Sequence, residues 1–244
     1  MRIDRKIENP VRWHWLIGET LVVVIGVLVA LGIEQAWSDR QDRELELAYL
    51  KRIHAAILRD IDFVDDFSRR STTLKMDALD AVGPVVRGFE PLPKDVETFL
   101  SNVSLGAIGG VSPTYFVRRS TFEDLISTGN LRLISDADLR NAIVLYYSVY
   151  EIQHKRIVER LTEYPAFVHG IVPAELRNDL NLAAFKSFNI DRAIEKVMSD
   201  EFQTLLNREY NLGLFMRREQ ARFLSSAKEF LQQLEAQIEQ LDFD

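Results

Sequence analysis

Between residues 21 and 33 the chain carries no polar side chain and reads LVVVIGVLVALGI. Alone, this run is short for a membrane-spanning helix, which needs about 20 residues. Its flanks are also mostly apolar and extend the segment from Trp15 to Trp37. A helix between these two residues is roughly 33 Å long, close to the hydrocarbon thickness of a bilayer. The pattern predicts a transmembrane helix over residues 15–37, after a short tail over residues 1–14.

The tryptophans support the same interpretation. All three of them, Trp13, Trp15 and Trp37, lie at the two edges of the apolar segment. Indole favours the headgroup region of a bilayer, because it is apolar but carries one hydrogen-bond donor. A cleaved signal peptide is the alternative, with Ala30-Leu31-Gly32 as the cleavage site. Against it, Glu19 lies where the apolar core of a signal peptide would begin, and the apolar character continues to Trp37.

The orientation of the segment follows from its flanks. Four Lys or Arg residues precede it, and four more follow within residues 40–52, so the charge bias alone is slight. The N-terminal tail is short and the following domain is large. We therefore expect the N-terminus in the cytoplasm and the domain outside, which in a bacterium means a single-pass protein of the inner membrane with a periplasmic domain.

Three residues within the segment suggest more than anchoring. Gly26 and Ala30 form a small-xxx-small pair, which allows another helix to approach closely. Glu19 lies seven residues before Gly26, on the same helix face. An ionisable residue in a span needs a partner or access to water. Glu19 is read as an interfacial polar residue, a helix-association contact or part of an ion pathway, and the sequence leaves all three open.

Residues 38–244 are predicted to form one all-α domain whose first helix continues from the membrane segment to about Gly83-Pro84. Further helices are expected over Asp95–Leu105, Ser120–Thr128, Pro173–Leu180 and Asp191–Met198. Ser135 is expected to cap a helix that runs to about Tyr164, and Asp200 to cap the last one. The expected ends are marked by Gly, Pro and capping residues.

Two of these helices carry apolar residues at alternating spacings of three and four, as in a coiled coil. The first seam consists of Leu47, Leu50, His54, Ile57, Ile61 and Val64. The second consists of Leu224, Ala227, Leu231, Leu234, Ile238 and Leu241. The two helices can pair antiparallel within one chain, in an up-and-down bundle, or each can join a homo-oligomeric coiled coil. The pattern does not separate these two uses.

The charge and the cysteine content of the chain exclude some classes of partner and chemistry. Residues 1–37 contain four basic and four acidic residues, so the net charge of −7 belongs to residues 38–244. An acidic domain repels a polyanion, so nucleic acid is not an expected partner. The chain has no cysteine, which excludes disulfides and thiol chemistry.

No catalytic, cofactor-binding or metal-binding motif is recognisable, and the sequence therefore predicts a protein that is not an enzyme and holds no cofactor. Glu151 and His154 form half of the Glu-x-x-His arrangement of di-metal bundles, but no second copy exists. Aromatic residues beside two arginines suggest a pocket for an anion or partner. Its residues would be Arg118, Arg119, Tyr146, Tyr147 and Tyr150, although ordinary core packing explains them equally well.

Two stretches of the chain carry a recognisable combination of residues. The first is Ile17-Gly18-Glu19 with the apolar run, Trp37 and a charged helix to Tyr49-Leu50. The second is TFEDLISTGNL over residues 121–131, followed by Leu133-Ile134, Leu139-Arg140 and Tyr146-Tyr147. Together they resemble a family of uncharacterised bacterial single-span proteins, domain of unknown function 6090. In that family Asn-Asn-Trp often follows the span, whereas this chain has Glu34-Gln35-Ala36-Trp37. The resemblance implies an uncleaved span and a helical domain, and no activity.

Two functions are consistent with these features. The first is a non-catalytic, membrane-anchored interaction module that self-associates or binds another envelope protein. The second is a periplasmic sensory or ligand-binding bundle, with the arginine and tyrosine cluster as its pocket.

Overall fold

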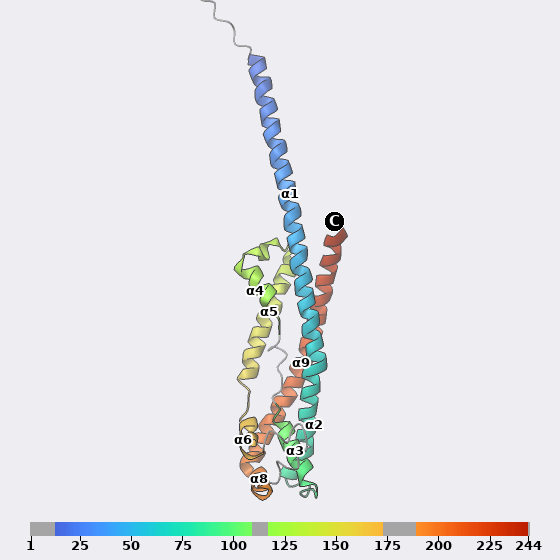
Figure 1. Cartoon of the computed structure of the whole chain (residues 1–244), viewed down its shortest axis with the longest axis vertical. Helices are drawn as coiled ribbons and strands as arrows, with labels where there is room; N and C mark the ends of the chain where they lie inside the picture. The colour runs from blue at the N-terminus through green and yellow to red at the C-terminus, as the bar shows by residue number, and fades with distance from the viewer. Residues whose placement is uncertain (1–12, 109–116, 173–188, 244) are drawn as a thin grey trace, which may run out of the picture.

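A computed structural model of the chain describes residues 13–108, 117–172 and 189–243, and every regular element in these ranges is a helix. The longest runs from α1 (Trp13–Asp62) through a π-helical turn, η1 (Phe63–Ser68), into α2 (Arg69–Val86). Over Glu19–Val86 this helix is unbroken for 68 residues, about 100 Å at 1.5 Å per residue. It projects far beyond the rest of the molecule at its N-terminal end (Figure 1).

Shorter helices and one long C-terminal helix complete the fold. They are α3 (Val96–Gly106), α4 (Ser120–Ser127), the 3-10 turn η3 (Asn130–Leu133), α5 (Ala137–Val158), α6 (Tyr164–Ile171), α8 (Ile190–Val197) and α9 (Asp200–Phe243). The all-α prediction is confirmed for the described residues. The expected helix over Pro173–Leu180 lies outside them.

The long N-terminal helix and α9 pack antiparallel within one chain. Lys51 pairs with Asp242 near the C-terminus, while Arg87 bonds Asn207 near the start of α9. The two seams lie in this interface, with Leu50, Ile57 and Leu234 completely buried. The structure therefore uses both seams inside the bundle. The C-terminus returns toward the end from which the apolar helix projects (Figure 1).

Several helix ends follow directly from capping chemistry. Asp95 accepts a hydrogen bond from the Thr98 amide at the start of α3, and Gly129, with φ of 72°, ends the α4 turn in the left-handed conformation that glycine adopts most readily. The long helix continues past the predicted end at Gly83-Pro84 and ends at Val86, with Pro84 in its last turn.

Three further predicted helix boundaries were wrong. Asp136, not Ser135, caps α5 by accepting a bond from the Leu139 amide. Ser135 instead donates its amide and hydroxyl to the buried carboxylate of Glu46. α5 ends at Val158, and residues 159–163 form a linker to α6. Ser199, not Asp200, caps α9, since its hydroxyl accepts a bond from the Phe202 amide.

The folded body begins later than the predicted domain boundary at residue 38. Residues 19–45 are all exposed, and Glu46 is the first buried residue of the chain's described part. A charged, helical stalk over residues 38–44 therefore separates the apolar segment from the bundle. Two exposed side-chain interactions between residues four apart lie on this stalk or at its start. Gln35 donates a hydrogen bond to Asp39, and Arg40 forms an ion pair with Glu44.

Candidate functional site

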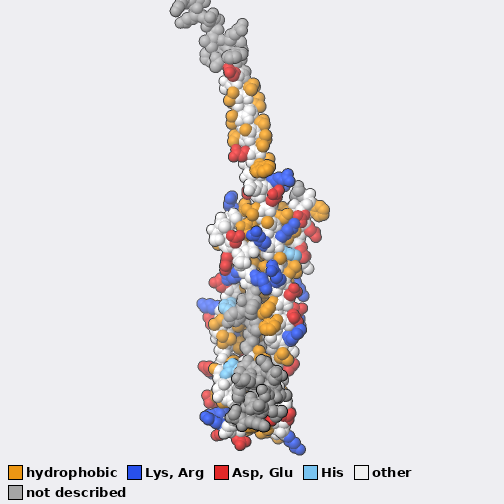
Figure 2. All heavy atoms as spheres, viewed as in Figure 1, with side chains coloured by type: hydrophobic (Ala, Val, Ile, Leu, Met, Phe, Trp, Pro, Cys, Tyr) orange, Lys and Arg blue, Asp and Glu red, His pale blue; other side chains and the backbone are white. Residues whose placement is uncertain are grey.

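The apolar segment has no protein covering it among the described residues. Ten large apolar side chains between Leu21 and Ile33 are 50–69% exposed, and Trp37 is 73% exposed. Figure 2 shows an apolar column that projects from a body studded with charged side chains. This helix is the one described helix that is long and apolar enough to cross a membrane, by length and composition.

The small-residue face of the segment is equally open. A Cβ atom added at Gly26 would meet no atom within 4 Å. Glu19 and Ala30, the other two residues of the predicted association face, are exposed. Within the described part of the chain, these three residues are therefore free to contact another molecule.

The predicted pocket residues lie mainly in the core that adjoins the stalk. Tyr146, Tyr147 and Tyr150 are each at most 6% exposed, and the Phe122 ring stacks on Tyr147 at a centroid distance of 4.4 Å. Burial, with a smaller contribution from the Asp60 carboxylate, raises the pKa of Tyr147 well above its usual range. The three phenols therefore stay neutral at physiological pH.

The two arginines of the predicted pocket are held by acidic side chains. Arg118 pairs with the buried carboxylate of Asp60 and also donates its backbone amide to it, at 3.1 Å. Arg119 lies 3.6 Å from Glu123 and 3.4 Å from Glu151. Tyr146 and Tyr150, by contrast, border a groove of about 260 Å³ between α5 and α9 that neither arginine lines. Arg119 and the Asp60 carboxylate both lie close enough to Tyr147 to shift its pKa. The five residues are therefore neighbours, but the structure does not place them around one common groove.

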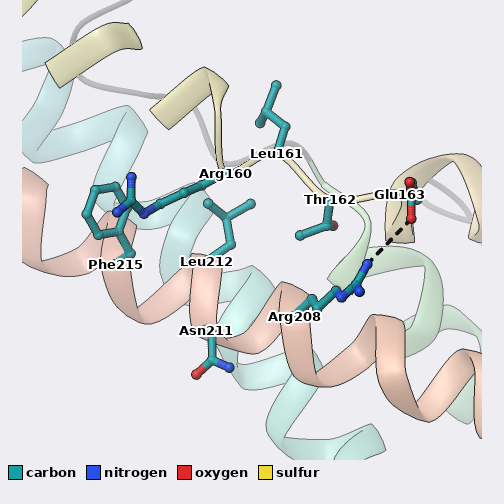
Figure 3. Close-up of a pocket in the computed structure, with 8 residues that line it drawn as sticks. All are labelled: Arg160, Leu161, Thr162, Glu163, Arg208, Asn211, Leu212 and Phe215. Carbon is teal, nitrogen blue, oxygen red and sulfur yellow. Dashed lines mark ion pairs between the residues drawn. The ribbon is translucent and has the colours of Figure 1, made fainter. Parts of the chain in front are cut away.

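A second cavity, of about 370 Å³, lies between the α5–α6 linker and α9. Arg160 places its guanidinium over the Phe215 ring, 4.6 Å from the centroid. Arg208 extends toward Glu163, 3.7 Å away. The two guanidinium groups point away from one another (Figure 3). The cavity therefore has two cationic groups on its border but no convergent set of polar groups, which ligand sites generally have.

Sequence reasoning missed a group of buried polar residues in the middle of the bundle. Lys75 pairs with Glu209, and the hydroxyl of Thr162 donates to the same carboxylate. Lys75 also donates to the Ile108 carbonyl, at 2.9 Å. Burial lowers the pKa of Lys75, although the Glu209 carboxylate opposes this effect. Among the described residues, no group of three His, Asp or Glu side chains is placed to hold a metal ion.

A signal for this group does exist in the sequence. Beyond Val64 the first seam continues at spacings of four, four and three, and its next positions are Ser68, Thr72 and Lys75. All three are buried. A polar residue at an apolar position of a seam indicates a buried polar partner elsewhere, although the sequence does not identify that partner.

No family model, curated protein sequence or solved structure matches this chain.

Proposed function

We propose that the protein is a membrane-anchored, non-catalytic helical module that associates with a second copy or with another protein of the bacterial envelope. The observation that carries the proposal is the unbroken helix from Glu19 to Val86. Its first part is apolar and exposed, and its second part supplies one wall of the bundle. A movement or association of the first part would act directly on the second.

The bilayer is the first partner that we propose. Full exposure of a large apolar side chain costs about 1.5–3 kcal/mol, so leaving ten of them 50–69% exposed to water would cost on the order of 9–17 kcal/mol. Lipid removes this cost along the whole segment. We assign residues 15–37 to the span of an inner membrane, with residues 1–14 in the cytoplasm and the bundle in the periplasm. We also propose that the chain is related to the uncharacterised single-span family that it resembles, domain of unknown function 6090.

The second partner would contact the face formed by Glu19, Gly26 and Ala30. Small side chains let two helix backbones approach closely in a membrane. The charged stalk leaves this helix free of the bundle's own helices. A periplasmic ligand-binding bundle has less support, because the two arginines at the cavity of about 370 Å³ point away from one another and neither predicted pocket arginine lines the groove beside Tyr146 and Tyr150.

Membrane insertion is tested with matched arginine substitutions. Leu28→Arg places a charge near the middle of the span, which costs about 2.5–3.5 kcal/mol, whereas Gln35→Arg places it near the interface, where it costs much less. Alkaline carbonate extraction of membranes should release Leu28→Arg in part and retain both Gln35→Arg and the natural chain. Release of the natural chain would refute the anchor.

Orientation and association use single cysteines, since the chain has none of its own. A membrane-impermeant maleimide should label Ser148→Cys in intact spheroplasts, and labelling only after lysis would place the bundle in the cytoplasm. Ala30→Cys should form disulfide-linked dimers in membranes, or cross-link to one envelope protein. Leu28→Cys, on the other side of the helix, is the control. Equal cross-linking of the two variants, or none, would refute the association face.

A further inference from the structure

The bundle contains two separate large hydrophobic cores along its length. The core next to the stalk contains Leu50, Ile57 and Val64 of the long helix, with Phe223 and Leu234 of α9. The core at the far end is built by α2, α3, α6, α8 and the first turns of α9. Each of the two long helices therefore takes part in both cores, and passes between them through the middle of the bundle.

The middle of the bundle is polar. Between Val64 and Met76, the only buried residues of the long helix are Ser68, Thr72 and Lys75. On α9, Glu209, Glu219 and Gln220 are also buried, and Glu209 and Gln220 bond directly to the long helix. These six residues, here called the polar layer, are six of the ten buried polar or charged residues of the described chain. The small apolar cluster of Ile157, Leu212 and Met216 is the one core cluster at this level.

Hydrogen bonds connect the two sides of the layer. The amide nitrogen of Gln220 lies 2.7 Å from the Ser68 hydroxyl, 2.7 Å from the Thr72 hydroxyl and 3.2 Å from the Ser68 carbonyl. Lys75 and Glu209 form the ion pair. Water can replace such contacts when the layer opens, whereas it cannot replace the contacts of an apolar core. Opening the bundle at this level therefore costs less than opening either core.

The long helix is also irregular at this level. Phe63–Ser68 is a π-helical turn, in which the Arg69 amide donates to the Val64 carbonyl five residues earlier. A π-turn inside an α-helix is uncommon and weaker than the helix around it, and such turns occur frequently at functional sites. The π-turn ends at Ser68, at the point where the first core ends and the polar layer begins.

Two surface hollows lie beside the layer. One of about 430 Å³ is lined by Arg69, Arg217 and Gln220. The one of about 370 Å³ at Arg160 and Phe215 is also lined by Thr162, which bonds Glu209. Helices α5 and α6 do not continue through this level. The linker between them passes the layer instead, and its Thr162 bonds Glu209. Among the described residues, only two continuous helices cross this level.

We propose that the polar layer and the π-turn form a flexing point, at which the far half of the bundle bends relative to the half that adjoins the stalk. The π-turn supplies the deformation in the long helix, and the layer exchanges its internal hydrogen bonds for water as it opens. The inference does not depend on membrane attachment, because it concerns contacts within the bundle. If the anchor is also correct, the flexing point lies on the same helix as the span.

Hydrogen exchange on the full-length protein in detergent micelles tests the proposal directly. Amides of residues 64–75 should exchange about tenfold faster or more than those of residues 50–60 and 78–83, although all lie within one helix. Uniform protection along residues 50–83 would overturn the proposal. This measurement needs no substitution, so it does not depend on how any variant folds.

A triple variant tests whether the polar layer causes the faster exchange at residues 64–75. Ser68→Ala, Thr72→Val and Gln220→Leu together replace one hydrogen-bonded part of the layer with apolar side chains, so exchange at residues 64–75 should slow about tenfold. Gln237→Leu, a buried substitution near the stalk, is the matched control and should leave these amides unchanged. An equal response to both variants, or no response to the triple variant, would show that the layer does not govern opening.

Spin-label distances test the movement. Ser148→Cys on α5 and Arg192→Cys on α8 are exposed and lie in the two halves, whereas Ser148→Cys and Lys228→Cys lie in the same half. The distance distribution across the layer should be the broader one, and it should narrow in the triple variant. Equal widths for the two pairs would refute bending.

Discussion

The ammonium group of Lys75 meets the carboxylate of Glu209 at the centre of the bundle, and neither side chain is more than 2% exposed. The two residues are 134 positions apart and belong to the two long antiparallel helices. Thr162 donates to the same carboxylate. This contact therefore ties the long helix, α9 and the α5–α6 linker together. It also lies in the layer that we propose as the flexing point.

Lys75→Met is expected to destabilise the protein by about 3–5 kcal/mol, because it leaves the charge of Glu209 buried without a partner. The double variant Lys75→Met with Glu209→Leu removes both charges and should recover most of this loss. Urea unfolding followed by circular dichroism measures both. A single variant as stable as the natural chain, or a double variant less stable than the single one, would contradict the expectation.

Asp60→Asn tests a buried carboxylate. Burial raises the pKa of Asp60 above 3.8, although bonds from Arg118 oppose the shift. Between 3.8 and the raised value the folded state binds more protons than the unfolded state, so stability from this group falls as pH rises through that window. Asp60→Asn removes the effect while its side-chain oxygen can still accept the Arg118 amide. Its stability relative to the natural chain should therefore be greater at pH 7 than at pH 4.

The check is a pair of urea titrations at the two pH values for each protein. Asp65→Asn, at an exposed position of the same helix, controls for the loss of a negative charge. The interpretation fails if Asp60→Asn is relatively more stable at pH 4 than at pH 7.

Gly106→Ala tests the packing of α3 in the far core. An added Cβ atom would lie 2.6 Å from a Leu79 methyl group and 2.9 Å from the Tyr164 hydroxyl. Tyr164 is fully buried, and its hydroxyl donates to the Val103 carbonyl, so it has little room to move. We expect a loss of about 1–3 kcal/mol from overpacking.

Gly170→Ala is the matched control, because nothing lies within 4 Å of a Cβ atom at that position. Alanine there should be neutral or slightly stabilising, by up to about 1 kcal/mol, since it favours the helix. Thermal unfolding of the two variants should therefore shift in different directions or by clearly different amounts. Equal shifts would show that the contact at Gly106 is unimportant.

Much of the architecture could be read from the chain alone. The apolar run between Trp15 and Trp37, the two seams and the Asp95 and Gly129 signals predicted the all-helical fold and most of its elements. These features are local, because periodicity and capping depend on residues within a few turns of one another. The wrong caps, Ser135 and Asp200, also have a local origin, because in each case the observed cap is the adjacent residue. Two adjacent capping residues compete at a helix start, and packing decides between them.

What the sequence determined by itself is which face of each helix is apolar and where the long exposed segment lies. Only the tertiary structure decided what covers each face. The seam that contains Leu50 packs against the seam that contains Leu234 within one chain. The periodicity alone was equally consistent with pairing between copies of the chain. The tertiary structure also joined Lys75 to Glu209 and Gln220 to Ser68. The reason is physical: a helical pattern reports the burial of a position, whereas the identity of its partner depends on the path of the whole chain.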